Sequence, residues 1–382
     1  MKVTVAIDSF KGSLSTFEAG DAAKAGIKKV YPEADVVVCP LADGGEGTVS
    51  AIVSGAGGEM QRVSVTGPLG DTVVAEYGII KESGTAIIEM AAAAGITLVS
   101  TEKRNPLNTT TFGVGEVIAD AIRKGCRKFI VGIGGSATND GGIGMLTALG
   151  FRFLDANGNQ IPVCGRGLGE LEKIDTSGAM KELAECEFHI ACDVKNPLCG
   201  RLGCSAIYGP QKGATPEIVE QMDGWLGQYA ELTKTILPRS DANYPGAGAA
   251  GGLGFAFLSY LGGTLESGIE LVMDAVGLEK HIKDSDIVVT GEGRLDGQSA
   301  MGKAPVGVAR LAKKYSKPVI AFAGCVTDDA TACNGQGIDA FFPILRAPCT
   351  LDEAMNIENA SANLTATAAQ AFNLAKTFCN LK

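Results

Sequence analysis

Aromatic residues are scarce in this chain, at 6% of 382 residues, and its 52 glycines follow no fixed period. The missing period excludes a collagen-like or low-complexity repeat. Internal repeats and disordered linkers are lacking too. The glycines cluster instead at the ends of expected strands, which is typical of loop-rich α/β enzymes. With 46% hydrophobic residues, a chain of this length predicts two domains with separate cores.

Excess positive charge is also lacking, because the formal net charge is -10 and the pI is about 4.9. This balance argues against nucleic acid or an anionic membrane as the main partner. The longest uncharged run, residues 242–265, contains seven glycines and Pro245. It therefore favours a buried loop and helix over a membrane span.

Signs of secretion are absent as well. Residues 1–8 predict a strand, without the apolar core and cleavage site of a signal peptide. The eleven cysteines include no C-x-x-C pair, and most lie in apolar runs, as Cys192 does. We expect buried, reduced thiols and a cytoplasmic location.

The hydrophobic pattern predicts two kinds of sheet. Apolar runs, which predict strands at residues 3–7, 34–39 and 285–290, alternate with helical segments such as residues 16–30 near both ends of the chain, as parallel strands buried on both faces do. Between them, residues 62–90 are rich in strand segments joined by hairpin-like turns. We therefore predict a discontinuous α/β domain of residues 1–62 and 260–382, interrupted by an inserted mixed α/β domain of residues 63–259. The active site is expected in the cleft between the two.

The most informative segment is GIGGSATNDGG, residues 132–142, which follows an apolar strand. Glycines let consecutive backbone N–H groups approach a phosphate without a Cβ in the way. The candidate phosphate-binding residues are Gly134, Gly135, Ser136, Thr138 and Asn139. Asp140 adds a carboxylate for a metal ion or a proton.

Two further polar loops follow N-terminal strands. In DSFKGS, residues 8–13, Asp8 and Lys11 can meet a charged substrate, although the segment also reads as a turn with a helix cap. In DGGEGT, residues 43–48, Asp43 and Glu46 suit a metal ion or substrate hydroxyls, and an acidic first helical turn is the alternative.

Three more segments carry paired charges. Asp193 follows a strand as a candidate base, and Lys212 in GPQKG is a candidate phosphate clamp. Either residue can equally belong to an ion pair. GEGRLD, residues 291–296, adds Glu292, Arg294 and Asp296, and the arginine can bind a carboxylate or phosphate with two hydrogen bonds.

Two nucleotide-binding patterns compete with this interpretation. Residues 297–303 match the first part of a phosphate loop, but Ala304 replaces the Ser or Thr that would bind Mg²⁺. The pattern Gly132-x-Gly-x-x-Ala137 follows a strand, with Asp155 near the place of a ribose-binding acid, so an NAD-dependent dehydrogenase of a small hydroxy acid stays open. A non-catalytic sugar-acid binding protein is the third alternative.

Taken together, the six polar segments resemble the signatures of the bacterial type I glycerate kinases, in order and over nearly the whole chain. The resemblance implies ATP-dependent phosphorylation of D-glycerate with Mg²⁺, typically at the 2-hydroxyl. It also implies a flavodoxin-like domain that carries an inserted α/β domain. Residues 324–329 and 267–270 depart from the expected pattern, the second by lacking a proline. A homodimer is left open.

On this basis we assign roles to the motif residues. Asp193, Lys11 and Arg294 are expected to be catalytic, with Asp193 as the base and Arg294 or Lys11 holding the carboxylate of glycerate. Asp8, Asp43 and Glu46 are expected to bind substrate. Asp140, Glu292 and Asp296 are expected to hold Mg²⁺, while the glycine loop and Lys212 bind the phosphates of ATP.

Overall fold

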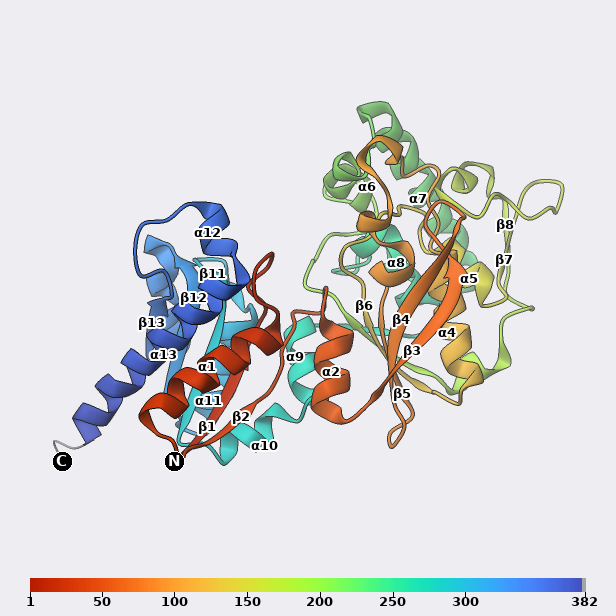
Figure 1. Cartoon of the computed structure of the whole chain (residues 1–382). Helices are drawn as coiled ribbons and strands as arrows, with labels where there is room; N and C mark the ends of the chain where they lie inside the picture. The colour runs from red at the N-terminus through yellow and green to blue at the C-terminus, as the bar shows by residue number, and fades with distance from the viewer. Residues whose placement is uncertain (380–382) are drawn as a thin grey trace. The chain divides into compact units, whose positions relative to one another are not determined.

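The computed structural model describes residues 1–379, which form a mixed α/β structure with one parallel and one mixed sheet (Figure 1). The chain divides into two compact units. The first unit comprises residues 1–43, 54–56 and 272–382, and the second comprises residues 44–53 and 57–271. Helices α2 (Thr48–Ala56) and α9 (Gly268–Ala275) cross the division.

The first unit is built on five parallel strands in the order β13-β12-β11-β1-β2. Counted within this unit, the order is that of a flavodoxin-like doubly wound sheet. Its strands are β1 (Lys2–Ile7), β2 (Asp35–Val38), β11 (Ile287–Leu295), β12 (Val319–Val326) and β13 (Ala340–Pro343). Its helices are α1 (Thr16–Val30), α10 (Leu278–Lys283), α11 (Ala304–Lys314), α12 (Leu351–Met355) and α13 (Ile357–Cys379).

Helix α1 shows how the sequence builds this unit. Ser15 and Glu18 form a capping box, in which each side chain binds the other residue's backbone N–H. Ile27, on the buried face of α1, joins a core that includes Val5 of β1 and Phe372 of α13. Burial of this apolar face fixes α1 and α13 side by side (Figure 1).

The second unit contains a six-stranded mixed sheet in the order β10-β9-β6-β5-β4-β3. Its strands are β3 (Glu59–Thr66), β4 (Thr72–Ile80), β5 (Thr85–Glu89), β6 (Lys128–Gly132), β9 (Glu187–Ala191) and β10 (Thr264–Glu266), and β7 (Arg152–Leu154) pairs separately with β8 (Lys173–Asp175). The helices are α3 (Ala91–Ala94), α4 (Phe112–Arg123), α5 (Ile143–Ala148), α6 (Cys204–Tyr208), α7 (Pro216–Ile236) and α8 (Ala249–Tyr260). Strands β5, β6, β9 and β10 are parallel, so their carboxyl ends share one edge.

Helix α8 begins with a left-handed turn. Ala250, Gly251 and Gly252 have φ values of 52°, 68° and 93°. A Cβ on Gly251 would lie 2.2 Å from the carbonyl oxygen of Thr138. Glycine therefore lets this turn pack directly against the segment predicted to bind phosphate, and the N–H of Gly141 donates to the Gly251 carbonyl at 2.9 Å.

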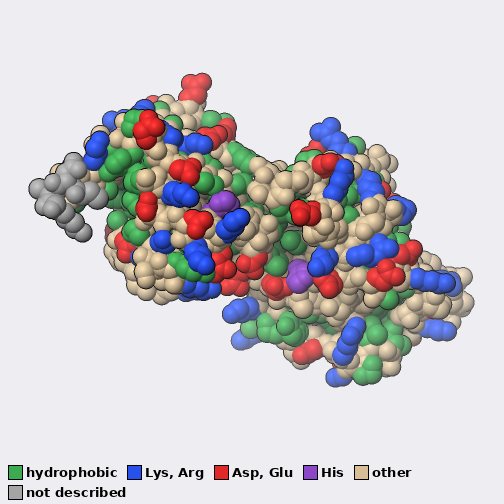
Figure 2. All heavy atoms as spheres, turned by 90° about the horizontal axis from the view of Figure 1, so that it is seen from below, with side chains coloured by type: hydrophobic (Ala, Val, Ile, Leu, Met, Phe, Trp, Pro, Cys, Tyr) green, Lys and Arg blue, Asp and Glu red, His purple; other side chains and the backbone are tan. Residues whose placement is uncertain are grey.

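The expected run of residues 242–265 is confirmed as loop and helix, and no helix among the described residues is long and apolar enough to cross a membrane. Acidic and basic side chains are interspersed over the face in Figure 2. The prediction of a strand that ends at Thr290 was wrong at its carboxyl end, since β11 continues to Leu295. Residues 324–326, where the sequence departs from the expected pattern, lie within β12.

Candidate active site

In the first unit, the predicted site residues gather where the strand order reverses. Ligands of doubly wound sheets bind at the carboxyl ends of the two strands at this point, here β1 and β11. Asp8 directly follows β1, and its N–H donates to the Gly291 carbonyl of β11 at 2.9 Å. Burial raises the pKa of the Asp8 carboxyl to about 7, and the negative charge of Asp43 adds to this effect. A carboxyl group titrating near neutral pH is a frequent feature of a functional site.

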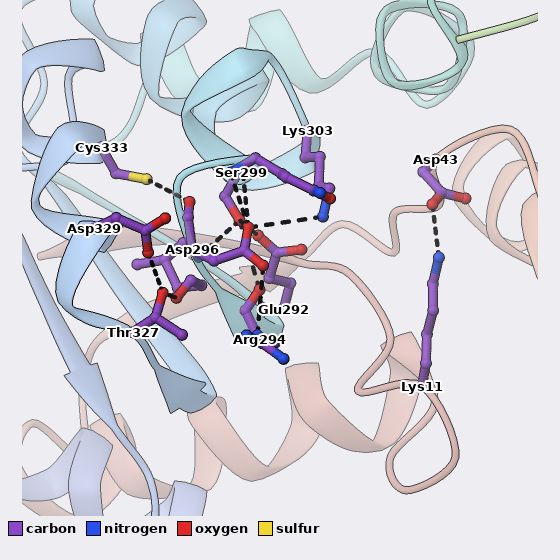
Figure 3. Close-up of polar contacts among 12 residues, drawn as sticks. Lys11, Asp43, Glu292, Arg294, Asp296, Ser299, Lys303, Thr327, Asp329 and Cys333 are labelled. Carbon is purple, nitrogen blue, oxygen red and sulfur yellow. Dashed lines mark hydrogen bonds and ion pairs between the residues drawn. The ribbon is translucent and has the colours of Figure 1, made fainter. Parts of the chain in front are cut away.

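Lys11 and Asp43 form an ion pair within the first unit. The Lys11 Nζ lies 2.8 Å from Asp43 Oδ2, and Figure 3 shows the two side chains pointing toward each other. Burial lowers the pKa of Lys11, but its hydrogen bond to Asp43 and the nearby carboxylates outweigh burial, so the pKa is raised overall. The Lys11 side chain is 73% exposed, so it is accessible to an anionic ligand.

The third cluster of the first unit is centred on the buried Ser299. Its hydroxyl lies 2.5 Å from Glu292 Oε1 and 3.4 Å from Asp296 Oδ1 (Figure 3). Burial raises the pKa of Glu292, while the Ser299 hydroxyl and Lys303 oppose this rise. The Arg294 Nε lies 3.4 Å from Asp296 Oδ2. The two carboxylates thus meet at the Ser299 hydroxyl, and Arg294 and Lys303 both lie beside Asp296.

In the second unit, the edge formed by β5, β6, β9 and β10 carries the remaining residues. The glycine segment follows β6, and Gly134 and Gly135 are its exposed residues. Ser136, Thr138 and Asn139 are buried. The hydroxyl of Thr138 and the amide oxygen of Asn139 have no hydrogen-bond partner. Because such buried atoms are normally satisfied, they point to a water molecule or ligand beside the segment.

Asp140 does not have the surroundings expected for a metal ligand. Its Oδ2 accepts hydrogen bonds from the N–H and hydroxyl of Thr111, both at 2.8 Å, and from the Gly144 N–H at 3.3 Å. Its Oδ1 accepts from the Gly142 N–H at 3.0 Å. The residue has no exposed surface, and burial raises its pKa against these donors. We therefore assign Asp140 to holding the glycine segment in place of the predicted metal role.

Lys212 is also turned inward. Its Nζ donates to the Ser136 hydroxyl at 2.8 Å and to the Thr138 carbonyl at 2.6 Å. Only 3% of the residue is exposed, and burial lowers its pKa to about 8. The structure thus places the predicted phosphate clamp beneath the glycine segment, where it binds the protein's own oxygens.

Asp193 lies just beyond β9 with its side chain exposed. Its Oδ1 accepts the N–H of Gly268, the first residue of α9, at 3.1 Å. The preceding residue is tied to the same edge, since the Cys192 N–H donates to the Glu266 carbonyl at 2.9 Å. Asp193 is therefore oriented by backbone while its carboxylate stays accessible, as a general base requires.

Glu89 is a site residue that our sequence analysis missed. It ends β5, and its carboxylate accepts the N–H of Val49, in the first turn of α2, at 2.8 Å. The pKa of Glu89 is raised overall, mainly by burial and also by the charge of the exposed Glu46, although the hydrogen bond from the Val49 N–H opposes this rise. An acid at the end of an apolar strand was the signal available in the sequence, and the hydrogen bonds of Glu89 now explain how residues 47–49 are held.

Comparison with known proteins decides the family. The protein-family model described as "Glycerate kinase family" matches residues 3–376 of this chain. The chain belongs to the glycerate kinase family. It is 50% identical to the glycerate 2-kinase of Escherichia coli (strain K12) over 374 residues, which cover 97% of this chain and 98% of that protein. It is 46% identical to the glycerate kinase of Bacillus subtilis (strain 168) over 380 residues, 99% of each chain.

A solved structure agrees with this placement in the glycerate kinase family. The crystal structure of a candidate glycerate kinase 2 from Salmonella typhimurium LT2 superimposes with a TM-score of 0.91 at 47% identity. The match covers 100% of this chain and 99% of that one. The dehydrogenase and binding-protein alternatives receive no support from these comparisons.

Members of a kinase family use ATP, and the carboxylates of the first unit fit the Mg²⁺ that usually accompanies it. Glu292 and Asp296 both reach the Ser299 hydroxyl. Proteins commonly hold Mg²⁺ with one or two carboxylates and let substrate phosphates complete its shell. Among residues 1–379 no group of three or more His, Cys, Asp or Glu side chains is arranged to hold a metal.

Proposed function

We propose that this protein catalyses the ATP-dependent phosphorylation of D-glycerate at its 2-hydroxyl. The observation that carries the proposal is similarity along the whole chain to an enzyme named glycerate 2-kinase, at 50% identity. Carboxylates and cations at the carboxyl ends of parallel strands supply the groups that phosphoryl transfer needs. The products are 2-phospho-D-glycerate, ADP and a proton.

Asp193 is proposed as the general base. The hydroxyl oxygen of glycerate forms a bond to the γ-phosphorus as the bond from that phosphorus to the β,γ-bridging oxygen breaks, and the hydroxyl proton passes to the Asp193 carboxylate. The hydrogen bond from the Gly268 N–H to Asp193 Oδ1 orients this carboxylate for that role. This assignment is supported by the exposure of the side chain and its fixed orientation.

The glycine segment is proposed to bind phosphates through backbone N–H groups near Gly134 and Gly135, with the buried Thr138 and Asn139 side chains beside them. Lys212 and Asp140 act by fixing the shape of this segment. Glu292 and Asp296 are proposed to hold Mg²⁺, which when bound supplies neutralisation of phosphate charge.

The remaining residues of the first unit are proposed to recognise glycerate. Arg294 and Lys11 carry exposed positive charge suited to a carboxylate. Asp8, Asp43 and Glu46 are each suited to accept hydrogen bonds from hydroxyl groups.

A coupled assay tests the function and its regiochemistry. The protein is incubated with D-glycerate, ATP and Mg²⁺, and the product is detected with enolase alone or with phosphoglycerate mutase plus enolase. We expect a signal with enolase alone, because enolase consumes the 2-phosphate directly. A signal that requires the mutase would assign the 3-hydroxyl, and no ADP release in either assay would contradict the kinase proposal.

Two further predictions, on cellular location and on oligomeric state, accompany this function. A cytoplasmic location is supported by the cysteines. The ten cysteines between positions 39 and 349 are all free thiols, as is usual in a reducing compartment. The homodimer stays a prediction, which size-exclusion chromatography with light scattering can measure.

A further inference from the structure

Lys303 has a place in the fold that its packing does not explain. It immediately precedes α11 and closes the segment of residues 297–303 that imitates a phosphate loop in sequence. Its side chain is 45% exposed, and the ion pair recorded for it is with Asp296 Oδ1 at 4.0 Å. In Figure 3 the ammonium group points toward the cluster of Glu292, Asp296 and Ser299.

A lysine at this position brings no benefit to the helix. The amino end of a helix carries partial positive charge, so cations are unfavourable there and acidic residues are preferred. The first turn of α11 contains no acidic residue, and no side chain caps its N–H groups. The electrostatics of α11 therefore oppose the charge that Lys303 brings, and its partner must be sought on the side of the carboxylates.

Asp296 binds its two neighbouring cations only loosely. Its Oδ1 already accepts the N–H groups of Gln298 and Ser299, at 3.0 and 3.1 Å. The Lys303 Nζ at 4.0 Å and the Arg294 Nε at 3.4 Å both lie beyond the 2.7–2.9 Å typical of a charge-assisted hydrogen bond. Both cations thus keep donors available for a second anion.

We propose that Lys303 binds phosphoryl oxygens beside the carboxylates of Glu292 and Asp296, and so is a catalytic residue of the transfer. This inference rests on the kinase function proposed above. The chemistry is that of a compact ammonium group on a phosphate that shares its remaining oxygens with a metal ion. The phosphoryl group belongs either to the nucleotide or to the phosphorylated product, and the two sources can be separated experimentally.

The test compares Lys303→Met with Lys303→Arg and with Lys314→Met, which removes an exposed lysine at the other end of the same helix. Turnover is measured against ATP and D-glycerate, and calorimetry measures binding of Mg²⁺ with a non-hydrolysable ATP analogue, of 2-phosphoglycerate, and of adenosine. For Lys303→Met we expect about a hundredfold or greater loss of kcat/KM for ATP. We also expect about tenfold weaker binding of the ATP analogue or of 2-phosphoglycerate, depending on the source of the phosphoryl group, with adenosine binding and the unfolding temperature unchanged.

Lys303→Arg should recover part of the loss because it restores the charge, and Lys314→Met should behave as the wild type. Equal activity and binding in Lys303→Met and wild type would overturn the proposal, as would a loss confined to the KM for glycerate. A lowered unfolding temperature in Lys303→Met that Lys303→Arg does not restore would also overturn it. If the wild type fails to phosphorylate glycerate, the proposed function fails, whereas the phosphate-dependent binding difference still tests Lys303.

Discussion

Replacement of Asp8 by Asn tests whether the buried carboxyl at the end of β1 costs the fold stability. Asn keeps the shape and an oxygen that can accept the Ser9 N–H, now bound to Asp8 Oδ1 at 2.7 Å. In the folded protein the pKa of Asp8 is raised from its ordinary value of 3.8 to about 7, first by burial and then by Asp43. The folded state thus retains a proton that the unfolded chain releases.

The sign and size follow from linkage. Between pH 3.8 and about 7 the folded protein binds more protons at Asp8 than the unfolded chain, so the contribution of Asp8 to stability falls as pH rises. At about 1.4 kcal/mol per pH unit, the accumulated cost by pH 8 is about 4 kcal/mol. Asp8→Asn should therefore match the wild type near pH 4, exceed its stability by up to about 4 kcal/mol at pH 8, and bind glycerate more weakly.

Hydrogen exchange of β1 amides, in EDTA and at both pH values, measures this locally. It is preferable to tryptophan fluorescence, since Trp225 lies in the second unit. Asp21→Asn, at an exposed position of α1, is the matched control. A variant no more stable than the wild type at pH 8, or a difference independent of pH, would refute the reasoning.

Three other substitutions probe the second unit. Asp193→Asn should lower kcat by roughly a hundredfold or more with nucleotide binding intact, and near-normal turnover would remove Asp193 as the base. Asp140→Asn should destabilise the second unit by about 2–5 kcal/mol, because buried donors lose a charged acceptor. Urea unfolding followed by the fluorescence of Trp225 measures this. An unchanged unfolding midpoint together with turnover that no longer depends on Mg²⁺ would favour the metal role instead. Because the pKa of Lys212 is lowered to about 8, the unfolded chain keeps a proton between pH 8 and 10.5 that the folded protein has lost. The stability of the wild type should therefore rise with pH over this range, by about 3 kcal/mol relative to Lys212→Met. A constant difference across that range would contradict this explanation.

Local signals predicted the elements well where they agreed with packing. Helix α1 spans the predicted residues 16–30, because its capping box and its apolar spacing mark the same ends. The predicted strand ended too early, at Thr290, because Gly291 and Gly293 are residue types that are common in loops. In the sheet they allow close approach, and a Cβ on Gly291 would lie 2.1 Å from the Phe322 carbonyl oxygen of β12. This requirement is tertiary and leaves no local mark.

The roles of individual polar residues were harder to predict than their presence. Asp140 reads as a ligand in a glycine-rich segment, and only folding brings Thr111, 29 residues away, to saturate its Oδ2. Lys212 likewise finds its partners in Ser136 and Thr138, more than 70 residues away. Sequence patterns therefore located the charged groups, whereas the direction of each side chain depended on distant contacts.

The extended β11 makes the spacing of two predicted site charges a property of the sheet. Glu292 and Arg294 pair in register with Ala323 and Cys325 of β12, so they share one face and stand about 6.6 Å apart along the strand. Deleting or inserting one residue before Glu292 would exchange these charges with the glycines that alternate with them. The spacing of these two charges is therefore set by the register of β11 against β12, so that a one-residue change of length within the strand is felt directly at the predicted site.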